Sequence, residues 1–137
     1  MGVIALVCGF STLARDRQIS PTNRLGQAYL LTTLITAVTA LGIYQQGGFG
    51  RPHVLAVLTL IALAVGTVAS GSVRVVSYSS TILFHLIPAV AETSTRLPPH
   101  APLIASQEAP ILRVIYLVIL VIFLVSVTIQ VRSLRKS

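Results

Sequence analysis

Long apolar runs without charge constrain this chain more than any other feature of its sequence. Residues 25–44 and 53–70 contain no Asp, Glu, Lys or Arg, and residues 111–131 contain only Arg113, near their start. A helix of about 20 mainly apolar residues is long enough to cross the ~30 Å hydrocarbon core of a bilayer. The sequence therefore predicts helices that cross a membrane.

The composition excludes two other classes of protein. Of the 137 residues, 54% are hydrophobic and 9% are charged. Soluble domains carry about 25% charged residues, so an ordinary soluble domain is excluded. Disordered chains need low hydrophobicity, so disorder is excluded by the same numbers. The single cysteine, Cys8, rules out a disulfide framework and a cysteine-based zinc site.

Two further segments complete the predicted architecture. Residues 73–90 are apolar but rich in hydroxyls, which indicates a helix facing other helices rather than lipid. Residues 2–14 are apolar but would make a helix of only about 20 Å. We therefore predict a single all-α domain over residues 1–137, a polytopic transmembrane helix bundle with four full spans and a short N-terminal fifth.

The arginines predict how such a bundle is oriented. With five alternating segments, one side receives seven basic residues: Arg15, Arg17, Arg24, Arg74, Arg132, Arg135 and Lys136. The other side receives Arg51, Arg96 and Arg113. Because basic residues are enriched in cytoplasmic loops, the C-terminus is expected in the cytoplasm and the loop of residues 91–110 outside. The net charge of +7 then reflects membrane topology and not a nucleic-acid partner.

Small residues and tyrosines predict how the helices pack and where they end. Ala62, Gly66 and Ser70 recur every four residues, a spacing that lets two helix backbones approach closely. Tyr29, Tyr78 and Tyr116 fall near expected helix ends, where tyrosine commonly anchors at the membrane interface.

Proline sets the expected limits of the outer loop. Pro88 is expected to bend or end the fourth helix. Four more prolines in residues 91–110 exclude a regular helix through the middle of that connection, which is then either a functional cap or a flexible segment.

The histidines are the best candidates for ligand binding or proton transfer. Counted from the turn near Gly71, His53 and His85 differ in depth by about 6 Å, so both fall in the outer layer of the bundle. Glu92 follows His85 by seven residues, and His100 and Glu108 lie on the adjoining loop. Three functions are open here: a divalent metal site from His53, His85 and Glu92, haem ligation by the two histidines, or proton or substrate handling in a small transporter.

A structural explanation of the same residues is also available. A histidine in the first turn of a membrane helix commonly sits at the headgroup level, and one inside a helix is commonly satisfied by a neighbouring polar group. Glu92 and Arg96 are four residues apart and are expected to pair. The sequence contains no phosphate-binding glycine loop, nucleophile elbow or zinc-protease motif.

The start of the second apolar run resembles a known family. Arg24, Leu25, Gly26 and Tyr29, followed by Gly47–Gly48–Phe49 and His53, resemble motifs of small bacterial membrane proteins that share a domain of unknown function. In that family a histidine stands where this chain has Asn23. The resemblance implies a multi-helix bundle in a bacterial inner membrane and supplies no activity.

Together these observations favour a non-enzymatic function. The leading expectation is a small inner-membrane accessory or structural subunit that acts through helix packing, with the lipid bilayer and a membrane protein or a second copy of itself as partners. A metal- or haem-binding protein using His53 and His85, or a small transporter, are the alternatives.

Overall fold

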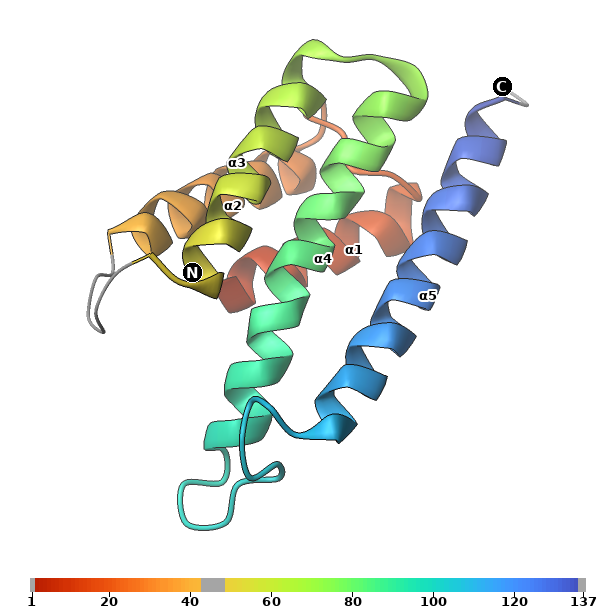
Figure 1. Ribbon diagram of the computed structural model, residues 1–137. Helices are drawn as coiled ribbons and strands as arrows, with labels where there is room; N and C mark the ends of the chain where they lie inside the picture. Colours follow the sequence, from red (N-terminus) through yellow and green to blue (C-terminus); the bar gives the residue numbers. More distant parts are fainter. Residues whose placement is uncertain (1, 43–48, 136–137) are drawn as a thin grey trace.

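The computed structural model describes residues 2–42 and 49–135 and shows five α-helices and no strand in those ranges. The helices are α1 (Gly2–Asp16), α2 (Arg24–Leu41), α3 (Arg51–Val68), α4 (Gly71–Arg96) and α5 (Pro110–Leu134) (Figure 1). The all-helical prediction is confirmed, and each predicted segment overlaps one helix. The last residues of the predicted 25–44 segment, together with Gly47 and Gly48, lie outside the described residues.

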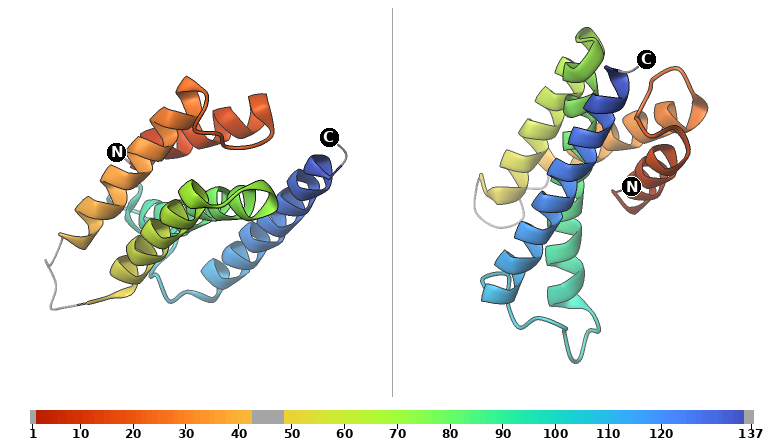
Figure 2. Two further views of the ribbon diagram at one scale, coloured as in Figure 1. Left: turned by 90° about the horizontal axis from the view of Figure 1, so that it is seen from above. Right: turned by 90° about the vertical axis from the view of Figure 1, so that its right-hand side faces the viewer.

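Two helical hairpins make up most of the fold. α1 packs against α2, and α3 packs against α4. The hairpins contact each other where α2 packs on α3 and α1 on α4, and α5 packs along α4. The views show α1 and α2 lying steeply across the direction of α4 and α5 rather than alongside them (Figures 1 and 2). The five helices therefore do not form a simple parallel array.

The chain reverses at two opposite ends of the molecule. The link between α1 and α2, the turn between α3 and α4, and the C-terminal end of α5 all lie at one end (Figure 2). The connection from α4 to α5 lies at the other end. This is the grouping of links that the charge count assumed, although the helices themselves cross at steeper angles.

A glycine beneath a tyrosine ring holds each hairpin together. In the first hairpin, a Cβ added to Gly9 would meet the ring of Tyr29 at 2.8 Å. In the second, a Cβ added to Gly66 would meet the ring of Tyr78 at 2.3 Å. Both tyrosines are fully buried. In each hairpin the missing side chain of one helix thus makes the space for the aromatic ring of the other.

These contacts correct two predictions from the sequence. Tyr29 and Tyr78 were expected as interface anchors, but both belong to the core because a glycine on the paired helix lets their rings lie between helices. Gly66 was expected to bring two backbones together, but it accommodates a side chain. Tyr116 is half-buried on α5.

The fourth helix does not end at its proline. α4 continues through Pro88 to Arg96, so the predicted end at residue 90 and the start of the loop at residue 91 are corrected to Arg96 and Leu97. A proline removes one helical hydrogen bond, and helices packed against neighbours tolerate that loss. The connection that follows is tied back to α4, because Ile104 N donates to Ser94 O at 2.9 Å.

The surface of this molecule is unusually apolar, and its interior contains several polar side chains. The buried polar residues in the described ranges are Thr12, Thr33, His53, Thr59, Ser79, Thr81 and His85, and they lie beside buried apolar residues such as Ile19 and Leu63. Its exposed side chains include a large set of Val, Leu and Ile on every helix. Soluble monomers rarely expose contiguous apolar surface on this scale.

Two of the described helices, α4 and α5, are long and apolar enough to cross a membrane by length and composition. The predicted four full spans are therefore corrected to two that meet this test. The apolar part of α3, Pro52–Val68, is too short, and α2 ends at Leu41 with four threonines among its 18 residues.

The glycine under Tyr78 generates a stability prediction. Gly66→Ala places a methyl group where the ring lies, so we expect a loss of about 1–3 kcal/mol in the free energy of unfolding in detergent micelles. Gly2→Ala is the control, because its Cβ meets Thr36 at an ordinary 3.7 Å, and it should change stability by less than about 0.5 kcal/mol. Equal effects of the two substitutions would contradict this packing.

Candidate functional site

A small hydrogen-bonded cluster centred on Thr81 joins the two hairpins. The Thr81 hydroxyl donates to the carbonyl oxygen of Tyr78 at 2.7 Å and also contacts the hydroxyl of Tyr29. Since the Thr81 proton is committed to that carbonyl, the Tyr29 hydroxyl is the donor in the second bond. His85 Nδ1 bonds the Thr81 carbonyl oxygen at 3.0 Å. The cluster therefore connects α2 with two successive turns of α4.

His85 lies at the end of this cluster, inside the bundle. Its side chain is 9% exposed, and its Nε2 atom is buried without a hydrogen-bond partner among the described residues. With Phe84 and Pro88 it borders a cavity of about 200 Å³ between α2, α3 and α4. Thr36, Ala37, Ala40, Pro52, Leu55, Ala56 and Thr59 complete the lining.

His53 helps to begin α3. Its Nδ1 accepts a hydrogen bond from the backbone N–H of Gly50 at 3.1 Å, which satisfies a donor that precedes the first turn. Its ring stacks on Phe49 with centroids 5.4 Å apart. Buried to 6% exposure, His53 has a clear structural function at the position where the sequence suggested a metal or haem ligand.

Glu92 ties the outer loop to α4. Its Oε2 pairs with Arg96 Nε at 2.5 Å, and its Oε1 accepts from Gln107 Nε2 at 3.0 Å. The expected Glu92–Arg96 pair is thus confirmed, on the last turns of α4 rather than in the loop. His100 and Glu108 are exposed on the connection between α4 and α5.

The structure does not bring His53, His85 and Glu92 together as a metal site. No group of three potential ligands is found within residues 2–42 and 49–135. His85 and Glu92 are seven residues apart on one continuous helix, which separates them by about 10 Å along its axis. Metal ligands lie about 2 Å from the ion, so metal binding by this set stays a prediction without geometric support.

Haem ligation by His53 and His85 is not supported by the cavity that His85 borders in the described part of the chain. The space beside His85 is about 200 Å³, below the ~300–1,000 Å³ usual for bound organic ligands. His53 is not among the residues that line it.

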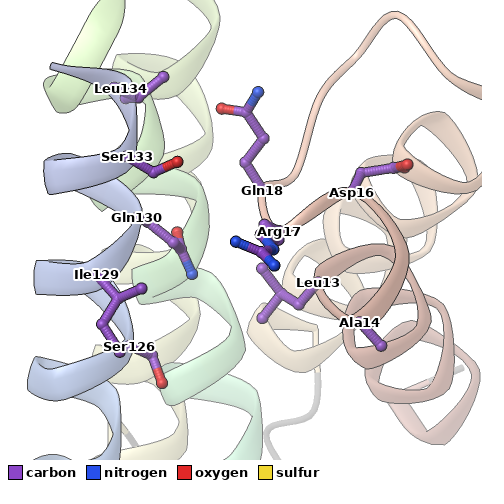
Figure 3. Close-up of a pocket in the computed structure, with 10 residues that line it drawn as sticks. All are labelled: Leu13, Ala14, Asp16, Arg17, Gln18, Ser126, Ile129, Gln130, Ser133 and Leu134. Carbon is purple, nitrogen blue, oxygen red and sulfur yellow. The ribbon is translucent and has the colours of Figure 1, made fainter. Parts of the chain in front are cut away.

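A larger cleft lies where the end of α1 faces the end of α5. This α1–α5 cleft has a volume of about 510 Å³ (Figure 3). It is lined by Leu13, Ala14, Asp16, Arg17 and Gln18 on one side and by Ser126, Ile129, Gln130, Ser133 and Leu134 on the other. Sequence reasoning missed it, because those two segments are over a hundred residues apart and carry no shared motif.

The side chains in the cleft have distinct orientations. Arg17, Gln130 and Ser133 point into the space between the helices, whereas Asp16 points away from α5 (Figure 3). Asp16 lies 3.9 Å from Arg15 and accepts a hydrogen bond from Asn23 at 2.7 Å. Arg17 forms no ion pair with any acidic residue in the part of the chain that the structure describes. The charge facing the cleft is therefore positive.

The comparisons with known proteins add no relative. No family model, no curated protein and no solved structure matches this chain. The likeness to small bacterial membrane proteins thus stays a resemblance based on a few residues. Of those, Gly26 has a clear packing function, since a Cβ there would lie 1.8 Å from the carbonyl oxygen of Ser20.

The Tyr29–Thr81 bond generates a prediction about coupling between hairpins. Tyr29→Phe and Thr81→Val should each lower the free energy of unfolding in micelles by about 0.5–1.5 kcal/mol. The double variant should lose less than the sum, because both substitutions remove the same bond. Tyr116→Phe serves as a control with no such bond among the described residues. Strict additivity would show that the two hydroxyls do not interact.

Proposed function

We propose that this protein is a small integral membrane protein that acts as a non-enzymatic accessory or structural subunit through helix packing. The observation that supports this proposal most directly concerns α5. It has the higher mean hydropathy of the two candidate spans, 2.8 against 1.4 for α4, and only 6% of its apolar window is buried. The most apolar helix is thus the least covered by its own chain.

The surface of α5 supports this proposal residue by residue. From the buried Leu112 to Gln130 its buried and half-buried positions recur mostly every three or four residues, and α5 packs along α4. Between Val114 and Val125 the remaining positions are exposed and apolar, among them Leu117, Val121 and Val125. A helix that is apolar all round is suited to lipid or to another helix, and not to water.

The hydroxyl-rich interior favours the same environment. Lipid offers no hydrophobic drive for helix association, so helices there rely on small residues and interhelical hydrogen bonds. Gly66 under Tyr78, the Tyr29–Thr81 contact, and the bond from Ser79 Oγ to Gln130 Oε1 at 2.9 Å are interactions of this kind.

The orientation belongs to the proposal as well. The α1–α2 link, the α3–α4 turn and the end of α5 lie at one end of the molecule, and that end carries most of the arginines. The positive-inside rule places it in the cytoplasm and the α4–α5 connection outside, in a bacterial inner membrane. α4 and α5 cross fully in this arrangement, α3 crosses with local thinning of the bilayer, and α1 and α2 are embedded at an inclination.

Cysteine labelling tests the crossing and its direction. In a Cys8→Ala background, Ser106→Cys should react with an impermeant maleimide on intact cells, because it lies on the α4–α5 connection. Ser70→Cys, in the α3–α4 turn, should react only after permeabilisation. Labelling of both positions from the same face would contradict the proposed orientation, and recovery of the chain in the soluble fraction would contradict the membrane location.

Photo-crosslinking tests whether α5 contacts a partner. A photoreactive amino acid at Val121, on the uncovered face, should give one discrete protein adduct in native membranes. The same group at Phe123, which lines an apolar pocket within the chain, should react internally and serves as the control. Adducts with lipid alone at Leu117, Val121 and Val125 would contradict a function through protein partners.

A further inference from the structure

We propose that the α1–α5 cleft binds an anionic membrane lipid, with the headgroup phosphate at Arg17 and one acyl chain between α1, α4 and α5. This inference rests on the proposed membrane location and goes beyond it by naming a ligand class and a site. Five observations carry the proposal: the charge at the mouth, the donors beside it, an apolar slot below, the depth of that slot, and the backbone of Arg17.

The mouth of the cleft is positively charged. Arg17 points into it (Figure 3), and Arg15 and Arg24 lie in the helix ends on either side of the same link. The chain contains three acidic residues. Glu92 and Glu108 belong to the opposite end, and Asp16 is directed away from the cleft towards Arg15 and Asn23. Although Asp16 also lines the cleft, its carboxylate is engaged by Asn23 and lies near Arg15, so the Arg17 guanidinium is the charge that faces a phosphate, and guanidinium groups bind phosphate through paired N–H donors.

Gln130 offers a second donor at the same level. Its Oε1 accepts the hydrogen bond of Ser79 at 2.9 Å, so the amide nitrogen is the group that remains for a ligand. Gln130 also points into the cleft from α5, opposite Arg17 (Figure 3). A headgroup between them would therefore contact both walls of the cleft.

An apolar slot adjoins this mouth. A second pocket of about 80 Å³ shares Leu13, Ser126 and Gln130 with the cleft. It is lined otherwise mainly by apolar side chains of α1, α4 and α5: Phe10, Ile82, Leu83, Leu86, Ile119, Ile122, Phe123 and Val127, with Ser79. A polar mouth above an apolar slot is complementary to an amphiphile rather than to a free anion.

The depth of the slot matches one leaflet. From Gln130 to Ile119, α5 rises by eleven residues, which is about 16 Å. Half of a ~30 Å hydrocarbon core is about 15 Å. With its phosphate at the level of Arg17, a lipid would therefore lay one acyl chain along α5, with part of that chain inside the slot of about 80 Å³ and the rest against the bilayer.

The backbone of Arg17 is strained in a way that directs its side chain. Its φ is +58°, in the left-handed region that favours glycine, and its N–H closes the end of α1 on the carbonyl of Leu13 at 3.0 Å. This position after a helix end is usually glycine. An arginine there gives up some stability, and its guanidinium faces α5.

Native mass spectrometry of the full chain in neutral detergent tests this site. We expect one tightly bound phosphatidylglycerol per chain, no comparable binding of phosphatidylcholine, and no binding of inorganic phosphate alone. Arg17→Gln should weaken phosphatidylglycerol binding about tenfold, the equivalent of about 1.4 kcal/mol. Arg113→Gln, with the same change of charge at the opposite end, should leave the affinity unchanged.

Two further variants separate binding from folding. Arg17→Gly removes the charge at a residue for which the left-handed conformation carries no strain, so lost binding there is not the result of a misfolded turn. Ser126→Phe fills the slot and should also lower the affinity for phosphatidylglycerol.

Each contrary outcome overturns the proposal. Equal binding of phosphatidylcholine would show that the anionic headgroup is not recognised. Binding of inorganic phosphate as strongly as phosphatidylglycerol would show that the cleft is an anion pocket and not a lipid site. Unchanged affinity for phosphatidylglycerol in both Arg17 variants would show that the lipid does not bind at Arg17. These results differ from failure of the proposed membrane location, which would appear as soluble, lipid-free protein or as labelling of Ser70 and Ser106 from one face.

Discussion

The fold depends on how two hydroxyl-bearing rings are held between helices. Tyr29 lies over Gly9 and Tyr78 over Gly66, so each hairpin closes around an aromatic ring that a larger residue on the opposite helix would displace. Thr81 then links Tyr29 to the turn that carries Tyr78. Shape and hydrogen bonds thus add to the apolar contacts of buried residues such as Leu63 and Ile82. Many further aliphatic side chains lie on the outer surface.

That division explains why α5 differs from the other helices. It adds few polar contacts to the core, with Gln130 bonded to Ser79 as the main one, and it presents Val, Leu and Ile on its remaining surface. In water such a helix would associate or aggregate. In lipid the same surface is neutral with respect to its solvent, so the Ser79–Gln130 bond and packing along α4 are sufficient to hold it.

The sequence predicted the helices better than the contacts between them. Apolar runs and turn residues located all five segments, because backbone hydrogen bonding and hydropathy act locally. They could not locate Tyr29 and Tyr78 in the core, since burial depends on a glycine elsewhere in the chain. The predicted end of the fourth helix at residue 90 was also too early, because the local sequence does not show that α4 continues through Pro88 to Arg96.

The candidate sites show the same limit more sharply. Helical rise put His53 and His85 at similar depth, but rise says nothing about which way a side chain faces. In the structure His53 caps α3, and His85 bonds to its own helix. The α1–α5 cleft could not be predicted either, because the sequence does not show that a steeply inclined α1 faces the last turns of α5 across an opening (Figures 2 and 3).

Because α1 is inclined, Arg17 affects the α1–α5 cleft as well as the predicted orientation. Had α1 crossed alongside α4 and α5, its end would have packed against them and left Arg17 to the water. Lying across them, it leaves an opening between its last turn and α5, and the left-handed Arg17 turns its charge into that opening. Arg17, one of the residues that predict orientation from the sequence, thus also defines the charge of the α1–α5 cleft.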